Sequence, residues 1–253
     1  QDFAIALSAL TAPPNHVWVS SGWSTVSPRP ATVCGVRGLF APPLALQDFG
    51  LDLVFEVDGR RLHDTGDLGK GDVGLLYAGG TWLPHQIERR GTYHHLKDGK
   101  LVSFAVRSYL VPLYGRAGFV LRVEVENRTD RSMVVRLLSQ VLPGSPADVP
   151  LGRWGFGQPG FAEKAAQACD AGIWRNNQVE IRLYSEQAVL QLQPGGTGSA
   201  RLAVIAGKPG KLSTPCLGLS NWEAETETAW QDRLGRHLAN VPVLTSDLPG
   251  LEE

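Results

Sequence analysis

Hydrophobic and polar positions alternate along much of the chain, which predicts a protein built mostly from β-strands. In residues 118–127, GFVLRVEVEN, apolar side chains recur at every second position from Phe119 on, and Arg122, Glu124 and Glu126 lie between them. A period of two places one side of a strand in a core and the other in water, as is usual in antiparallel sheets. Similar segments begin at His16, Leu51, Leu101, Ser132, Val179, Ala188 and Ala200.

Turn-forming residues between these segments indicate how the strands connect. Asp58-Gly59 and residues 97–100, KDGK, each divide two strand-like arms, because Gly and Asp tolerate the positive φ of a tight hairpin. Residues 194–199, PGGTGS, are expected to continue the same meander. About a dozen strands are too many for one open sheet, so two sheets should pack face to face. The predicted fold class is all-β, a large two-sheet antiparallel β-sandwich.

One strongly helical segment, residues 220–238, follows the strands. Ser220 is expected at the N-cap with Glu223 three positions later, which is the pattern of a capping box. Apolar side chains at multiples of four form one stripe that must be buried against another surface. They are Trp222, Trp230, Leu234 and Leu238. We therefore expect a β-sandwich domain over residues 1–219 and a linker helix with a tail over residues 220–253.

Composition and charge narrow the classes of partner. With 24 basic and 25 acidic residues, and a formal net charge of -1, the chain lacks the basic surface of proteins that bind nucleic acid or anionic membranes. No apolar run reaches the roughly 18 to 20 residues of a membrane helix, and no signal-peptide pattern opens the chain. We expect neither nucleic acid nor membrane as a partner. Cys34, Cys169 and Cys216 follow no metal-binding spacing, so we expect free thiols and favour the cytoplasm.

No arrangement of reactive residues stands out as catalytic. Residues 155–160, GFGQPG, match the glycine spacing of a dinucleotide site, but Pro159 lies within them and no βαβ unit surrounds them. His94 and His95 are neighbours on a predicted strand, so their side chains point to opposite faces and do not share a metal ion. The acidic residues are scattered, without the paired carboxylates of a glycosidase. We expect no cofactor, no metal and no catalytic residue.

Tryptophan side chains are the best candidates for ligand contact. Indole rings stack on sugar rings, and a concave aromatic surface on a sandwich is a common carbohydrate platform. The candidates are Trp82, Trp154 and Trp174, the last two within the long irregular stretch 143–177. The competing interpretation is that these rings anchor the core or an interface.

The pattern as a whole resembles the N-terminal half of the six-hairpin glycosidases. The resemblance rests on a strand-turn-strand unit, a later strand, the helix and the tail. These are FVLRVEVENRTDRSMVVRLL (119–138), SARLAVIAG (199–207), WEAETETAWQDRL (222–234) and VPVLTSDLPGLEE (241–253). In that family a super-sandwich, similar to galactose mutarotase, precedes a linker helix and an (α/α)6 barrel that carries the catalytic carboxylates.

The resemblance implies a non-catalytic module of a glycoside hydrolase or related carbohydrate-active enzyme. Such a module buttresses the catalytic barrel, in cis or in trans, and can contact an oligosaccharide. Trp222, Trp230, Leu234 and Leu238 are the residues expected to contact the barrel. The family's catalytic motifs would lie beyond residue 253, so no catalytic residue is carried over.

Two alternatives remain open. Sugar mutarotases resemble the same super-sandwich and use a His acid with a carboxylate base, which would make this chain an enzyme, a mutarotase-like sugar epimerase. The candidates are His85, His94 and His95 with Glu88 or Glu124, and such a pair would lie about 5 to 7 Å apart across a pocket. The other alternative is a stand-alone sandwich that binds carbohydrate, or that docks a partner protein through an exposed helix stripe.

Overall fold

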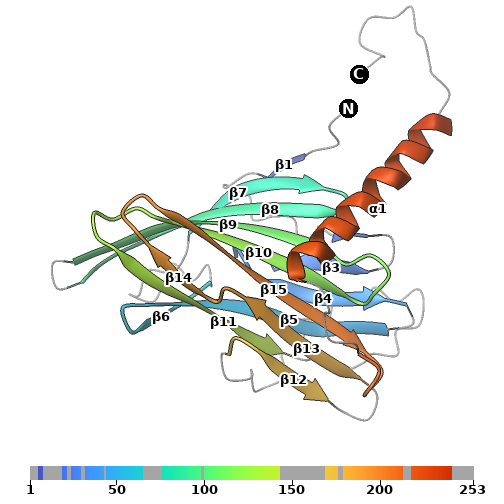
Figure 1. The fold of residues 1–253 in the computed structure, drawn as a ribbon, viewed down its shortest axis with the longest axis horizontal. Coiled ribbons are helices and arrows are strands. Elements are labelled where there is room, and N and C mark those ends of the chain that lie inside the picture. The colour runs from blue at the N-terminus through green and yellow to red at the C-terminus, as the bar shows by residue number, and fades with distance from the viewer. Residues whose placement is uncertain are drawn as a thin grey trace, which may run out of the picture.

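The protein is a sandwich of two antiparallel β-sheets, with a C-terminal helix against the outside of one of them (Figure 1). The computed structural model describes residues 5–7, 19–21, 24–29, 32–42, 44–64, 76–97, 100–142, 169–175, 179–212 and 218–240. The predicted all-β fold with two sheets and a terminal helix is confirmed.

The larger sheet, called the main sheet below, has eight strands among the described residues. Their order is β1 (Ile5–Leu7), β7 (Leu76–Leu83), β8 (Gln86–Lys97), β9 (Lys100–Pro112), β10 (Gly118–Asn127), β15 (Thr197–Gly207), β13 (Glu180–Glu186) and β12 (Gly172–Arg175). The second sheet runs β14 (Val189–Leu192), β11 (Met133–Leu142), β5 (Leu44–Val57), β4 (Val36–Ala41), β3 (Thr25–Pro28) and β2 (Val19–Ser20), with β6 (Arg60–His63) on β5. Helix α1 (Leu219–Asn240) follows.

The core lies between the two sheets, and β10 shows how its pattern builds it. The alternating apolar positions from Phe119 to Val125 are buried, whereas Arg122 and Glu124 stay half-exposed on the outer face. Aromatic rings meet across the interface: Phe49 of β5 lies 6.0 Å from Phe119, centroid to centroid, in an edge-on arrangement. Burial of such faces stabilises the fold by about 25 cal/mol per Å² of apolar surface.

Two of the predicted reversals are confirmed. Asp58 and Gly59 have φ angles of 50° and 73° between β5 and β6, the positive values that a two-residue hairpin turn requires. Lys97 and Lys100 face each other at the end of the β8–β9 hairpin. Local turn chemistry was therefore enough to predict these connections.

The connection between β14 and β15 differs from the prediction for residues 194–199. β14 pairs with β11 in the second sheet, whereas β15 pairs with β10 and β13 in the main sheet, so the chain crosses between sheets instead of extending one meander. The buried side chain of Asn127 holds this crossing. Its Nδ2 donates to the carbonyl oxygens of Leu192 (3.3 Å) and Gln193 (3.1 Å), and its backbone N–H donates to Gly196 (2.9 Å).

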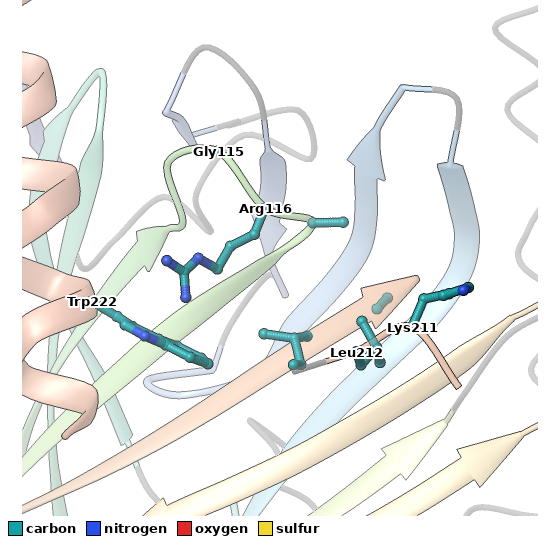
Figure 2. A pocket seen from close by; sticks show the side chains of 8 residues that line it. Gly115, Arg116, Lys211, Leu212 and Trp222 are labelled. Atoms are coloured by element: carbon teal, nitrogen blue, oxygen red, sulfur yellow. The ribbon is translucent and has the colours of Figure 1, made fainter. Parts of the chain in front are cut away.

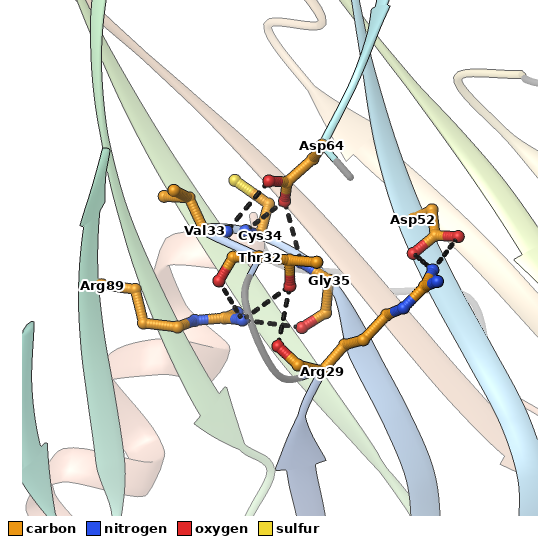
Figure 3. Close-up of polar contacts among 8 residues, drawn as sticks. All are labelled: Arg29, Thr32, Val33, Cys34, Gly35, Asp52, Asp64 and Arg89. Atoms are coloured by element: carbon orange, nitrogen blue, oxygen red, sulfur yellow. Dashed lines mark hydrogen bonds and ion pairs between the residues drawn. The ribbon is translucent and has the colours of Figure 1, made fainter. Parts of the chain in front are cut away.

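A buried carboxylate fastens residues 32–35 to the core (Figure 3). Asp64, directly after β6, accepts hydrogen bonds from the backbone N–H groups of Val33 (2.9 Å), Cys34 and Gly35 (3.1 Å). Burial raises the pKa of Asp64 to about 6, although the hydrogen bonds from Val33 and Cys34 and the nearby guanidinium of Arg89 oppose this shift. Burial also raises the pKa of the Cys34 thiol.

Arg89 binds the same segment from the other side. Its side chain is completely buried in β8, and Nη1 donates to the carbonyl oxygens of Thr32 (3.3 Å) and Gly35 (2.7 Å). The hydroxyl of Ser108, on the neighbouring strand β9, donates to the carbonyl of Val33. These contacts satisfy backbone groups that have no strand partner, which is what allows an irregular segment to lie in the interior.

We expect Asp64→Asn to lower the free energy of unfolding by about 2–4 kcal/mol at pH 7, because an amide nitrogen would face backbone donors. The folded-state pKa of about 6 exceeds the usual aspartate pKa of 3.8, so the folded protein binds more protons than the unfolded chain between these pH values. The wild type should therefore lose stability relative to the variant as pH rises from about 4 to about 6, by about 1–3 kcal/mol.

Urea denaturation of both proteins between pH 4 and pH 7 measures this difference. Asp58→Asn, at an exposed turn position that Asn tolerates, is the control and should change stability by less than about 0.5 kcal/mol. A difference in the free energy of unfolding between wild type and Asp64→Asn that stays constant with pH would contradict the raised pKa of Asp64.

Candidate functional site

Helix α1 is fixed to the outer face of the main sheet by a second, smaller apolar cluster. Residues 219–226, called the helix root below, contribute Leu219 and Trp222 to it. The sheet contributes Val120, Ala203 and Ile205, and Leu113 directly follows β9. Only 4% of Trp222 is exposed, and the ring of Tyr184 meets its indole edge-on with centroids 6.5 Å apart.

Ion pairs reinforce this apolar contact. Glu223 of the helix root accepts hydrogen bonds from Nε of Arg122 (2.8 Å) on β10 and Nε of Arg201 (3.2 Å) on β15. Glu225 pairs with Arg116 at 3.1 Å. The side chain of Glu223 is 15% exposed and that of Glu225 is 47% exposed, so water and salt screen the Glu223 pairs less.

The helix is capped by a distant residue and not by the predicted capping box. It begins at Leu219, whose backbone N–H donates to Oε1 of Glu186 at 2.6 Å. Glu186 ends strand β13, and its negative charge also complements the positive end of the helix dipole. Ser220 lies inside the helix and Glu223 turns to the sheet, so the predicted box of these two residues is wrong.

His85 connects the middle of α1 to the turn between β7 and β8. Its Nε2 lies 2.7 Å from Oε2 of Glu227, and its ring stacks on Trp230 with centroids 5.1 Å apart and planes inclined by 21°. Only 4% of His85 is exposed, and its Nδ1 finds no hydrogen-bond partner within the described residues. Sequence reasoning missed this contact, since 142 positions separate the two partners and no local pattern joins them.

The last part of α1 extends past the edge of the sheet (Figure 1). Arg233 still donates to the carbonyl of Ser21 at 3.3 Å, but it and the described side chains after it are exposed, except the half-buried Leu234. The side chain of Leu238 lies outside the described residues. Of the predicted partner contacts, Trp222 is instead an anchor within this chain, because its indole is covered. Trp230 and Leu234 keep part of their surface in solvent.

The predicted sugar-contacting tryptophans do not come together. Trp82 lies on β7 and Trp174 on β12, near opposite edges of the main sheet, and both pack partly buried against the core. Trp154 lies outside the described residues. Contact with a sugar therefore stays a prediction for each ring separately, without the shared aromatic platform.

The histidines of β8 do not form the predicted pair with Glu88. His94 and Glu88 share a face of β8 but are separated by six positions, about 20 Å at 3.3 Å per residue. Nδ1 of His94 lies 2.7 Å from the hydroxyl oxygen of Ser103, and His95 contacts the guanidinium of Arg60. Neither arrangement provides an acid and a base across one sugar ring.

A row of polar side chains crosses the outer face of the main sheet beside the helix root. Glu88, Tyr109, Arg122 and Arg201 occupy paired positions on β8, β9, β10 and β15, and we call them the polar row. The guanidinium of Arg122 lies 3.9 Å from the ring centroid of Tyr109 and binds Glu124 at 2.7 Å. Both carboxylates of the predicted acid–base pairs thus contact arginines.

The described residues contain neither a metal-binding cluster nor a membrane-spanning helix. Among the described residues, no group of three or more His, Cys, Asp or Glu side chains is arranged to hold a metal ion. Within that part of the chain, no helix combines the length and apolar character needed to cross a membrane.

We expect Trp222→Ala to lower the free energy of unfolding by about 3–5 kcal/mol, because it removes the largest buried side chain of the helix root. Leu234→Ala should cost less than about 1 kcal/mol, because half-exposed positions bury little surface. Urea denaturation followed by circular dichroism measures both values. Amide exchange along α1 reports whether the helix detaches before the sandwich unfolds. Equal effects of the two substitutions would contradict the anchoring.

Comparison with known proteins assigns the chain to no family: no family model matches the chain, and no curated protein matches its sequence.

Proposed function

We propose that this chain is a non-catalytic β-sandwich module of a glycoside hydrolase or related carbohydrate-active enzyme. Its helix α1 would connect the sandwich to a catalytic (α/α)6 barrel and hold the two at a set spacing. The resemblance of the strands, helix and tail to six-hairpin glycosidases motivates the proposal. The order of the architecture, a large two-sheet sandwich followed by one helix, supports it.

The observation that carries the proposal is the asymmetry of α1. The helix root is fixed by the buried Trp222 and by the ion pairs of Glu223, whereas the side chains after Trp230 are mostly exposed. A helix of 22 residues spans about 33 Å, so it acts as a spacer whose first part is attached to the sandwich and whose last part is left exposed. Leu234 then offers apolar surface to a second domain.

The polar row favours an additional contact with an oligosaccharide. Carboxylates and guanidinium groups together can accept from and donate to sugar hydroxyls, and Tyr109 adds a ring between them. These groups are half-exposed on an open sheet face directly beside the helix root. An oligosaccharide bound there would lie close to the domain that α1 leads to.

We expect the purified chain neither to release reducing sugar from soluble glycans nor to accelerate anomer exchange of glucose or galactose. The reason is that the histidines of β8 lie far from Glu88 and that arginines bind the predicted carboxylates. Reducing-end assays and proton NMR measure these reactions. Release of reducing sugar would overturn the module proposal, and anomer exchange that disappears in Glu88→Gln or Glu124→Gln would overturn it in favour of an epimerase.

The barrel is tested by the coding sequence downstream of Glu253 and by crosslinking. We expect a domain of helical hairpins of roughly 350 residues, or a separately encoded one that co-purifies with this chain. A photo-crosslinker at Leu234 should then react with that domain. The same probe at Gln191, an exposed position on the second sheet, should not. A coding sequence that stops at this helix, with no helical domain captured from Leu234, would contradict the proposal.

A further inference from the structure

A cavity of about 340 Å³ lies beside the helix root (Figure 2). Its walls come from the β9–β10 turn, the end of β15, the residues that follow β15, and α1. The side chains that matter for its chemistry are Arg116, Ala117, Ile205, Lys211, Leu212 and Trp222. Its volume is at the lower end of the range for small-molecule sites, which suits a ligand of one ring.

The walls of this cavity are held in place by contacts of their own. On one side, Gly118 begins β10 directly after the β9–β10 turn, and its carbonyl oxygen accepts a hydrogen bond from the hydroxyl of Ser24 at 2.9 Å. On the opposite wall, the backbone N–H of Gly210 donates to Glu180 at 3.0 Å. This bond and two arginines lower the pKa of Glu180 to about 2, so its carboxylate stays charged at neutral pH. These contacts fix the backbone beside both walls of the cavity.

The lining combines positive charge with apolar surface. The guanidinium of Arg116 lies 4.6 Å from the centroid of the Trp222 ring, and Lys211 is exposed at the other end of the cavity (Figure 2). Lys208 adds another positive charge in the same turn, and Glu225, paired with Arg116, opposes them. The positive excess selects an anion over a cation.

We propose that this cavity binds a small organic oxyanion, a carboxylate or a phosphate monoester, with a compact apolar or ring-shaped body. Lys211 binds the oxyanion at its end of the cavity, because an ammonium is a usual partner of such groups, and Arg116 adds positive potential from the end at Trp222. Ile205, Leu212 and the edge of Trp222 cover the body. The inference goes beyond the proposed function and does not depend on it.

Occupation of the cavity should also strengthen the attachment of α1. Trp222 is both a wall of the cavity and the anchor of the helix root. A compound that binds only when this wall is in place stabilises the docked helix by mass action. The cavity would then regulate how firmly the spacer helix is held.

The test uses the whole chain with phenyl phosphate and benzoate as probes, followed by nitrogen-proton NMR and calorimetry. Both should bind saturably, with a Kd on the order of 1 mM, as for compounds of fragment size. Lys211→Gln should weaken binding about fivefold, the loss expected for one partly exposed charge contact. Ala117→Leu should abolish it by filling the cavity. Lys208→Gln, in the same turn but outside the lining, should bind as the wild type does.

Four outcomes would overturn the proposal. The first is that neither probe binds saturably below about 10 mM, the weak limit for such fragments. The second is that Lys211→Gln and Ala117→Leu, shown to be folded by circular dichroism, bind the probes as the wild type does. The third is equal binding of benzyl alcohol, which has the ring without the charge. Inorganic phosphate should bind more weakly than phenyl phosphate, and equal affinity would refute the role of the apolar wall.

Discussion

The main sheet is apolar on both faces at one end, and this constraint determines where the helix must lie. In β15 the residues from Leu202 to Ala206 are all buried. Leu202 and Val204 face the sandwich core, whereas Ala203 and Ile205 face outwards, where water would meet them without α1. Because exposed apolar surface is costly, the sheet requires a cover at this end, and Leu219 and Trp222 provide it.

Polar contacts convert this apolar attachment into a fixed direction. Apolar packing alone is non-directional, so a helix held only by Trp222 could rotate or slide on the sheet. Glu186 fixes the first backbone N–H of the helix, Glu223 binds both neighbouring strands, and Glu227 meets His85 further along. Three attachment points along one axis define the direction in which α1 leaves the sandwich. That direction is what a spacer between two domains needs.

The same region brings together the polar row, the cavity and the helix root. Arg122 belongs to the polar row and binds Glu223, while Trp222 anchors the helix and forms a wall of the cavity. Binding on either side of the root would therefore act on groups that position α1. The buried cluster of Asp64 and Arg89 lies in the interior behind this surface and keeps the irregular residues 32–35 in the core.

The sequence by itself determined the features that depend on neighbours along the chain: the alternating strand of residues 118–127, the positive-φ turn at Asp58-Gly59 and the presence of a terminal helix. These follow from side-chain period and backbone sterics. Tertiary structure alone decided that β14 and β15 belong to different sheets, that Glu186 caps the helix and that His85 meets Glu227. Periodicity shows which face of an element is apolar, but it carries no information on which distant element will cover that face.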